Sequence, residues 1–331
     1  MLSYVLRRLL IMVPTIAVIS FVSFVIIQAP PGDYLTTLMA ELEQSGDAVD
    51  LQMIEALRAR YHLDDPFVVQ YANWIWDFMR GDFGISLEFR LPVRQLIWER
   101  LLLTVTISLV TLMFTYIAAI PVGIYAATRQ YSIGDYVFTF IGFIGLATPN
   151  FLLALVLLFV GFAVFGQNFG GLFSQEYIEA GWSLGKVIDL LRHLWIPVIV
   201  VGTAGTAGLI RVMRGNLLDE LKKQYVVTAR SKGLGETALL FKYPVRMAVN
   251  PVISSGAYLL PNLISGATIT SVVLSLPTTG PLLLRSLLNQ DMYVAGAFVM
   301  LLSTLTVIGT LISDIVLAWS DPRIRFGTVE A

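Results

Sequence analysis

The sequence predicts an all-α polytopic membrane protein with six transmembrane helices. Of its 331 residues, 56% are hydrophobic and only 14% are charged, whereas about 25% of the residues in a soluble globular protein are charged. Six apolar segments are long enough to cross a hydrocarbon core, which needs about 20 helical residues. Lysine and arginine gather in alternate connecting segments, as expected for a multi-pass protein.

The first apolar segment, 9–27, follows Arg7 and Arg8, which places the N-terminus in the cytoplasm. A cleaved signal peptide is the alternative, but the apolar run is longer than a usual signal sequence and no small-x-small cleavage site follows it. We therefore interpret it as an anchor. The five further candidate spans are about 101–127, 136–165, 194–212, 248–276 and 294–318.

Six spans place both termini on the same side of the membrane. The segments expected in the cytoplasm carry thirteen lysines and arginines, against three in the two short loops expected outside. Both termini are thus predicted to be cytoplasmic. The span at 136–165 contains Pro149 and Asn150, so we expect it to tilt, kink or break there.

The segment 30–100 is predicted to be an insertion on the outer side, with six basic and twelve acidic residues. The apolar spacing predicts one short helix after Asp50 and a second that contains Tyr71 and Met79 and could lie on the membrane surface. The insertion either packs as a cap on the helices or receives a partner. The predicted divisions are the anchor 1–29, the insertion 30–100, the transmembrane core 101–318 with a cytoplasmic loop at 213–247, and the tail 319–331.

The longest polar stretch between the later apolar segments runs from 219 to 251. Apolar residues at helical spacing predict one short amphipathic helix over 217–232. Lys232 followed by Gly233 is a helix-stop signal, because glycine accepts the left-handed conformation. A second short helix is predicted over 236–243. The product is a helix–glycine–helix knob with a basic surface, held between two apolar segments.

Several classes of chemistry are excluded by composition. The chain has no cysteine, and its two histidines, His62 and His193, lie in separate polar stretches, so no metal site is predicted. The net charge of −1 argues against nucleic acid as a partner. The spans offer no set of catalytic groups, so we predict no catalytic residues and no enzyme activity.

The exclusion of carrier, pump and enzyme chemistry leaves a passive helical pathway, whose energy would come from another subunit. Ion-coupled carriers need ionisable groups near the bilayer midplane, but Asp135 and Asp314 lie near span ends, where we expect them to pair with interfacial cations. No phosphate-binding G-x-x-x-x-G-K-[ST] motif occurs; the nearest sequence, around Lys186, is interpreted as part of an outer loop. The cytoplasmic knob is the obvious place for an energy-supplying contact.

The run from Tyr225 to Leu234, YVVTARSKGL, followed by Arg246 and Asn250-Pro251, resembles the EAA loop of ABC-importer permeases of the dipeptide/oligopeptide/nickel branch. Val227 stands in place of the glutamate in the loop's name. Further matches follow in the family's order along nearly the whole chain: Tyr4 with Arg7-Arg8, Pro31-Gly32-Asp33, Gly81-Asp82-Phe83-Gly84-x-Ser86, Pro92-Val93, Leu274-Ser275-x-Pro277, and Asp321-Pro322-Arg323-Ile324-Arg325.

This resemblance implies a type I importer fold in a bacterial-type inner membrane. The chain would form half of a translocation pathway together with a second homologous permease, two ATPases would dock on the cytoplasmic side, and a solute-binding protein would dock outside. ATP and Mg would bind the ATPases, with no cofactor on this chain. In the family the EAA loop forms a coupling helix that sits in a groove of the ATPase. The matching positions are Tyr225, Thr228, Ala229, Arg230, Lys232, Gly233 and Leu234.

The solute implied by the resemblance is a dipeptide or oligopeptide. Ser271 stands where peptide permeases often have glutamate, and Thr278-Thr279-Gly280 where they often have Gly-x-Gly, so oligosaccharides or opines are alternative solutes. An alternative of another class is a membrane scaffold that recruits cytoplasmic partners without transporting anything.

Small and hydroxyl residues cluster in the fourth and fifth spans. Close helix packing, which favours small residues at interfaces, is the preferred interpretation for any one of them. A pathway for diverse solutes would also use short polar side chains. Thr268 and Ser271 are our candidates for lining it.

Overall fold

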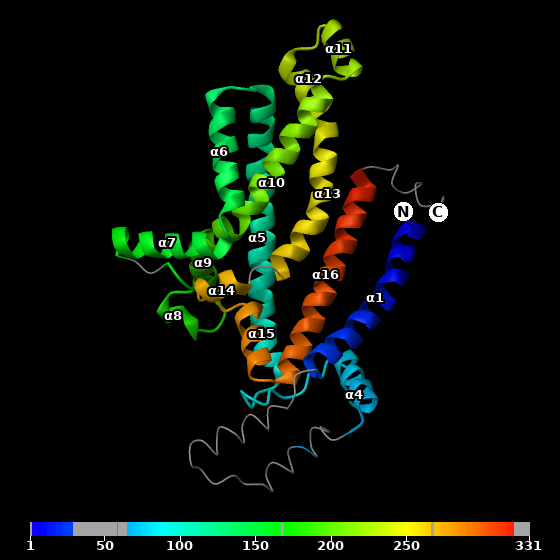
Figure 1. The fold of residues 1–331 in the computed structure, drawn as a ribbon, viewed down its shortest axis with the longest axis vertical. Coiled ribbons are helices and arrows are strands. Elements are labelled where there is room, and N and C mark those ends of the chain that lie inside the picture. Colours follow the sequence, from blue (N-terminus) through cyan, green and yellow to red (C-terminus); the bar gives the residue numbers. More distant parts are fainter. Residues whose placement is uncertain (1, 29–57, 59–64, 167–168, 266–267, 321–331) are drawn as a thin grey trace. The chain divides into compact units, whose positions relative to one another are not determined.

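The computed structural model describes residues 2–28, 58, 65–166, 169–265 and 268–320, and within these the regular elements are helices (Figure 1). One isolated antiparallel bridge joins Ile85 to Pro92. The helices are α1 (Leu2–Gln28), α4 (Phe67–Met79), α5 (Val93–Thr128), α6 (Ile133–Ala147), α7 (Asn150–Phe165), α8 (Gln175–Ile178), α9 (Leu184–His193), α10 (Trp195–Leu221), α11 (Gln224–Ser231), α12 (Glu236–Lys242), α13 (Pro244–Ser265), α14 (Thr268–Val273), α15 (Thr279–Leu288) and α16 (Met292–Ser320).

Four of the described helices are long and apolar enough to cross a membrane: α1, α5, α10 and α16. The pair α6 and α7 makes a fifth if it is counted as one broken span. The fifth apolar segment of the sequence, 248–276, is divided between α13 and α14, and residues 266–267 lie outside the described part. The chain is thus a helical multi-pass protein, and the total of six spans stays a prediction.

Several predicted boundaries were wrong in the same direction, because polar residues continue the helices beyond their apolar cores. Helix α5 begins at Val93, eight residues before the predicted span, and α10 continues to Leu221 instead of ending near 212. The predicted helix that contains Tyr71 and Met79 is confirmed as α4. The helix expected after Asp50 lies outside the described residues.

The predicted interruption near Pro149 is confirmed. Helix α6 ends at Ala147, α7 begins at Asn150, and their axes differ by 105° (Figure 1). Proline cannot donate a backbone hydrogen bond, so it fits the first turn of a new helix better than the interior of an old one. Here Pro149 is the residue just before α7, and its carbonyl accepts from the amides of Leu152 and Leu153 at 3.0 and 3.1 Å.

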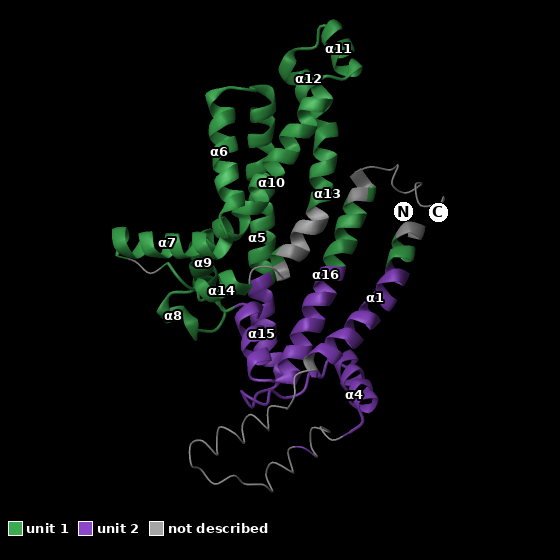
Figure 2. Ribbon diagram, in the orientation of Figure 1, with its two compact units in different colours: residues 1–8, 105–277, 308–331 green, residues 9–104, 278–307 purple. Residues whose placement is uncertain are grey.

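The chain divides into two compact units, coloured separately in Figure 2. Unit 1 comprises residues 1–8, 105–277 and 308–331. Within it, α10 packs against α6, α7 and α13. A buried apolar cluster joins α5, α10 and α13; its members are Ala119, Ala127, Leu209, Met213, Leu217, Val245, Ala248 and Val252.

Small residues bring the helices of unit 1 close together. A Cβ atom added to Gly145 of α6 would lie 2.7 Å from Cγ2 of Thr203 in α10, and one added to Gly202 would lie 3.1 Å from the ring of Phe114 in α5. These distances leave no room for a larger side chain without displacement. The packing interpretation of the small residues in the fourth span therefore holds at Gly202 and Thr203.

Ion pairs hold the two aspartates that lie near span ends. Arg214 of α10 donates two hydrogen bonds of 2.9 Å to the buried Asp135 of α6. Asp314 of α16 lies 3.3 Å from Arg8 of α1. Both aspartates thus have cationic partners, as the sequence predicted. Such a bidentate pair also satisfies the carboxylate oxygens that burial would otherwise leave without hydrogen bonds.

Unit 2 comprises residues 9–104 and 278–307. Its apolar core joins the start of α5 to α15 and α16 through Val93, Ile97, Leu282, Val294, Ala297 and Phe298. At the start of α16 the fully buried Asp291 accepts hydrogen bonds from Ser86 Oγ at 2.5 Å, the Glu88 amide at 3.2 Å and the Val294 amide at 3.3 Å. Asp291 therefore caps α16 and ties it to the segment that precedes α5.

Burial raises the pKa of Asp291 above its ordinary value, and the nearby Glu88 carboxylate raises it further, although the three hydrogen bonds oppose this. Glu88 itself pairs with Arg285, with 2.6 Å between Oε1 and Nε. A raised pKa in the folded state means that the folded protein binds this proton more tightly than the unfolded chain does. The contribution of this proton to the free energy of unfolding is therefore present in full at low pH, and it is lost as the pH rises through the raised pKa of the folded state.

We predict that the Asp291→Asn variant loses this pH dependence. Asparagine is neutral at every pH and keeps an oxygen that can accept from Ser86 and Val294. The melting temperature of the wild-type protein in detergent should fall as the pH rises above about 4, the ordinary aspartate value, and that fall should be smaller in the variant. The exposed Asp219→Asn is the control and should follow the wild type. Equal slopes for Asp291→Asn and the wild type would contradict the prediction.

Candidate functional site

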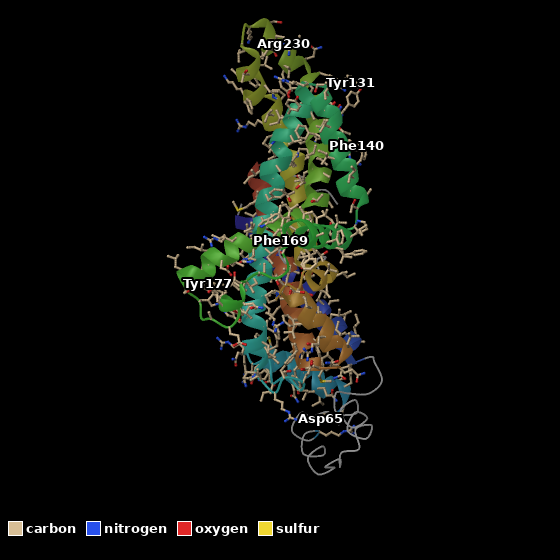
Figure 3. All side chains as sticks on the ribbon, turned by 90° about the vertical axis from the view of Figure 1, so that its left-hand side faces the viewer. Asp65, Tyr131, Phe140, Phe169, Tyr177 and Arg230 are labelled. Atoms are coloured by element: carbon tan, nitrogen blue, oxygen red, sulfur yellow. The ribbon has the colours of Figure 1, made fainter. Side chains whose placement is uncertain are left out.

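The candidate site is the knob formed by α11 and α12 between the long helices α10 and α13 (Figure 1). Figure 3 shows Arg230 at one end of unit 1, beyond Tyr131, whereas Phe169 and Tyr177 lie toward its other end. The single helix predicted over 217–232 was wrong. Helix α10 ends at Leu221, and Lys223 has extended backbone angles before α11 begins at Gln224. The second predicted helix, over 236–243, is confirmed as α12.

Glu220 fastens the start of α11 to the end of α10. Its carboxylate accepts hydrogen bonds from Lys223 Nζ at 2.7 Å and from the Tyr225 hydroxyl at 2.5 Å. Burial raises the pKa of Tyr225, and the hydrogen bond to the Glu220 carboxylate raises it further, so Tyr225 remains a neutral donor at physiological pH. These contacts hold the change of direction at Lys222–Lys223.

A small apolar cluster packs α11 against α12. Val226, Ala229 and Leu239 are buried in it, and Leu234 and Tyr243 pack around them. Val226 and Ala229 are three residues apart, which places both on the same face of α11. The knob therefore has a core of its own that keeps its two short helices together.

The turn between α11 and α12 is a Schellman motif. The Gly233 amide donates to the Arg230 carbonyl at 3.0 Å, and the Leu234 amide donates to the Ala229 carbonyl at 3.4 Å. Gly233 has φ +76°, the left-handed conformation that this motif requires and that glycine adopts without steric cost. Leu234 then packs beside Ala229 in the apolar cluster. The predicted helix stop at Lys232-Gly233 is confirmed.

An ion pair closes the same turn on its outer side. Arg230 Nε lies 2.6 Å from Glu236 Oε1, and Nη2 lies 3.0 Å from Oε2. The hydrogen bonds from Arg230 lower the pKa of the Glu236 carboxyl. We refer to this bidentate pair of Arg230 and Glu236 as the clasp. It joins the end of α11 to the start of α12 across Gly233.

The outward surface of the knob combines apolar and basic side chains. Val227 is 47% exposed and Phe241 is 58% exposed, large fractions for apolar residues. Thr228, Lys232 and Gly233 are also exposed. We refer to Val227, Thr228, Lys232 and Phe241 as the outer face. Phe241 is two residues from the buried Leu239, and residues two apart on a helix point in nearly opposite directions.

The seven residues predicted for coupling thus separate into three groups. Thr228, Lys232 and Gly233 are exposed, while Ala229 is buried and Leu234 is half-buried in the knob's core. The side chains of Tyr225 and Arg230 are bound within the chain, to Glu220 and Glu236. Sequence reasoning missed Val227 and Phe241. The helical period could have identified them, because it turns Val227 away from the direction of the buried Val226 and Phe241 away from that of the buried Leu239.

The two predicted pathway residues lie on α14, away from the knob. Helix α14 packs against α7, and Ser271 is buried while Thr268 is half-buried. Their role in the pathway stays a prediction.

Lys186 lies in a helix and not in the predicted loop. It belongs to α9, and its buried ammonium group donates to the Ala180 carbonyl at 2.8 Å and lies 4.9 Å from the Phe173 ring. The backbone amide and the hydroxyl of Ser174 each donate a hydrogen bond of 2.7 Å to Asp189, which also belongs to α9. These contacts hold the segment between α7 and α9 against α9. Within the described residues, no group of three or more His, Asp or Glu side chains could hold a metal ion.

Comparison with known proteins shows the family. Residues 119–326 match the family described as "Binding-protein-dependent transport system inner membrane component", and residues 1–110 match its N-terminal counterpart, "Binding-prot-dependent transport system membrane comp, N-term". The chain belongs to this family of transport permeases. The knob, at 224–242, lies within the first of these matches.

Relatives named for their transport functions match along nearly their whole length. The chain is 37% identical to the oligopeptide transport system permease protein AppB of Bacillus subtilis, over 98% of this chain and 100% of the relative. It is 29% identical to the dipeptide transport system permease protein DppB of Escherichia coli, over 98% and 99%. It is 30% identical to the peptidoglycan transport system permease protein YejB of Agrobacterium fabrum, over 98% of each. As a permease subunit, the chain is not itself an enzyme.

We predict that Leu239→Ala opens the knob. Truncation of a buried leucine costs about 2–5 kcal/mol, and this cluster has few other members. Amides of α11 and α12 should therefore exchange with deuterium faster in the variant. Phe241→Ala, an exposed position on the same helix, is the matched control and should leave exchange unchanged. Identical exchange in the two variants would show that the cluster does not hold the knob together.

Proposed function

We propose that this chain is a transmembrane subunit of an ATP-driven importer for dipeptide-like or oligopeptide-like solutes. The names of AppB and DppB, an oligopeptide and a dipeptide permease that match 98% of this chain, support peptides as the solute. Oligosaccharides and opines are the alternatives to be tested beside them. The scaffold alternative has no structural observation in its favour.

In the proposed assembly, the chain pairs with a second homologous permease to enclose the pathway, and Thr268 and Ser271 line part of it. Two ATPases bind ATP and Mg on the cytoplasmic side, and a solute-binding protein delivers the solute from outside. With six spans, both termini and the knob would lie in the cytoplasm, and the richness of the knob's segment in lysine and arginine supports this orientation. The insertion at 30–100 then lies outside.

We propose that the knob is the coupling element and that its outer face is the part that enters the ATPase. The observation that carries this is the exposure of Val227 and Phe241 on a segment whose core buries Val226, Ala229 and Leu239. Exposed apolar side chains beside a basic residue are suited to a groove with an apolar floor and acidic rim. Lys232 supplies the basic residue.

Arg230 has a different part in this proposal from the one that the resemblance implied. It positions the turn through the clasp and does not itself contact the ATPase. An exposed ion pair contributes little free energy by itself, typically below about 1 kcal/mol. The clasp matters here for its geometry, because a bidentate contact fixes the direction of both side chains. The clasp thereby fixes the turn that orients the outer face.

Uptake into proteoliposomes tests the proposed function. The chain is reconstituted with its partner subunits, and the binding protein is loaded with a labelled pentapeptide or with a labelled oligosaccharide of similar mass. We expect ATP-dependent uptake of the peptide and none of the oligosaccharide. Uptake of the oligosaccharide alone would show that the solute is an oligosaccharide and not a peptide. Uptake of neither solute, with the ATPase bound to the chain, would favour the scaffold.

We predict that exchanging the two residues of the clasp restores function that either single change removes. Arg230→Glu places two carboxylates side by side, and Glu236→Arg places two guanidinium groups together, so each should lower the peptide transported per ATP hydrolysed. The double variant Arg230→Glu/Glu236→Arg should recover most of the coupling. If Arg230 contacts the ATPase directly, the double variant will stay as impaired as Arg230→Glu. Lys232→Glu is the comparison, since it should weaken ATPase binding without any rescue from position 236.

We predict that coupling depends on the backbone conformation at Gly233. A non-glycine residue in the left-handed region costs about 1–2 kcal/mol, and no atom lies within 4 Å of a Cβ placed there, so Gly233→Ala changes conformation without a clash. Gly233→Pro is more severe, because proline cannot adopt a positive φ and lacks the amide that donates to Arg230.

The measured quantity is again the ratio of peptide transported to ATP hydrolysed, which should fall in the order glycine, alanine, proline. Gly215→Ala in α10, where a Cβ also meets no atom and φ is not positive, is the matched control and should be tolerated. A fully coupled Gly233→Pro variant would refute the coupling role.

A further inference from the structure

Helix α4 is fastened to one end of α1 by its aromatic side chains. The Phe24 ring lies 5.2 Å from Phe67 and 5.5 Å from Trp74, and the Phe21 ring lies 5.4 Å from Tyr71. The Tyr71 hydroxyl hydrogen bonds with Ser20 Oγ at 2.8 Å. Gln28 at the end of α1 donates to Gln70 at 3.0 Å. These contacts determine which face of α4 is turned inward.

The remaining surface of α4 is divided by polarity. Val68 is 72% exposed, Trp76 54% and Met79 66%, and Val69 and Ala72 are exposed beside them. At about 100° per residue, these five residues fill one continuous arc about 100° wide. The next arc holds the exposed Asn73, Asp77 and Arg80. The exposed surface therefore has an apolar side and a polar side, in addition to the packed face.

The apolar arc of α4 consists of Val68, Val69, Ala72, Trp76 and Met79, and α1 also exposes apolar side chains where it meets α4. The part of α1 that meets α4 presents Phe21, Val22, Val25 and Ile26. Helix α1 qualifies as a membrane span over Val5–Ile26, with a mean hydropathy of 2.7. Exposed apolar side chains on such a span are suited to contact with lipid. Hydrogen bonds join α4 to Ser20 and to Gln28, the last residue of α1. Figure 1 shows α4 beside this end of α1.

We propose that α4 lies along the membrane–water interface, with its apolar arc in contact with lipid and with Asn73, Asp77 and Arg80 directed to water. A helix lying in the interface needs this division between an apolar and a polar side. Trp76 and Arg80 support the assignment, since the guanidinium carbon lies 4.6 Å from the Trp76 ring centroid. Tryptophan is enriched at the level of the lipid headgroups, and long basic side chains near it extend toward water.

This placement gives α4 a mechanical role. Because it is packed on α1 and immersed beside it, α4 resists movement of the end of α1 along the membrane normal. The inference concerns unit 2 alone and does not depend on how the knob is coupled to an ATPase.

Spin labelling tests the proposal, and the chain is suited to it because it contains no cysteine. Single cysteines are introduced at Val68, Ala72 and Met79 in the apolar arc, and at Asn73 and Asp77 in the polar arc as matched controls on the same helix. Each variant carries a nitroxide and is reconstituted in phospholipid vesicles with cysteine-free partner subunits. Power saturation then measures collisions with oxygen, which dissolves in lipid, and with a nickel chelate, which stays in water.

We expect a several-fold excess of oxygen over nickel collisions at positions 68, 72 and 79, and the reverse at 73 and 77. Nickel collisions at 68, 72 and 79 equal to those at 73 and 77 would place the apolar arc in water and overturn the proposal. Low collision rates for both reagents in the apolar arc would show that another protein covers it, which would also overturn the proposal.

Discussion

The absence of hydrogen-bonding partners in the hydrocarbon core is the constraint on which the rest of this structure depends. A backbone in lipid must satisfy its own amides and carbonyls, and a single chain segment does so as a helix. A helix that stops within the hydrocarbon therefore needs polar groups from elsewhere in the protein, whereas one that stops outside it can also use water. At the start of α16 Asp291 supplies them, and at the end of α11 the carbonyls of Ala229 and Arg230 are bonded by the amides of Leu234 and Gly233.

The two interruptions in unit 1 have different causes. At Pro149 the chain changes direction by 105° between two strongly apolar helices. At Lys222–Lys223 the side chains are exposed and the turn is stabilised by the carboxylate of Glu220. The first interruption follows from proline's lack of a donor. The second follows from a local ion pair and hydrogen bond, which have no periodic signature in the sequence.

Much of the fold follows from hydropathy and helix-stop signals alone. The spans at α1, α5, α10 and α16, the break at Pro149, the helix α4 and the turn at Gly233 were all predictable, because apolar runs, proline and glycine act locally. The start of α5 and the C-terminal end of α10 were not predictable, since polar residues extend both helices once tertiary contacts stabilise the extra turns. In the knob, the pairing of Arg230 with Glu236 depends on how the intervening turn folds. Composition identified a basic knob but could not show that one of its cations is already paired within it.

The position of the knob between α10 and α13 has a consequence for how a displacement would travel. These two helices pack directly against each other and share the cluster around Leu217 and Val245. The knob is joined to α10 through Glu220 and continues directly into α13 at Pro244. A force applied to the knob therefore acts on α10 and α13 together and does not bend one helix away from the other. The two helices should move as one rigid body, with any bending confined to the ends that lie far from the knob.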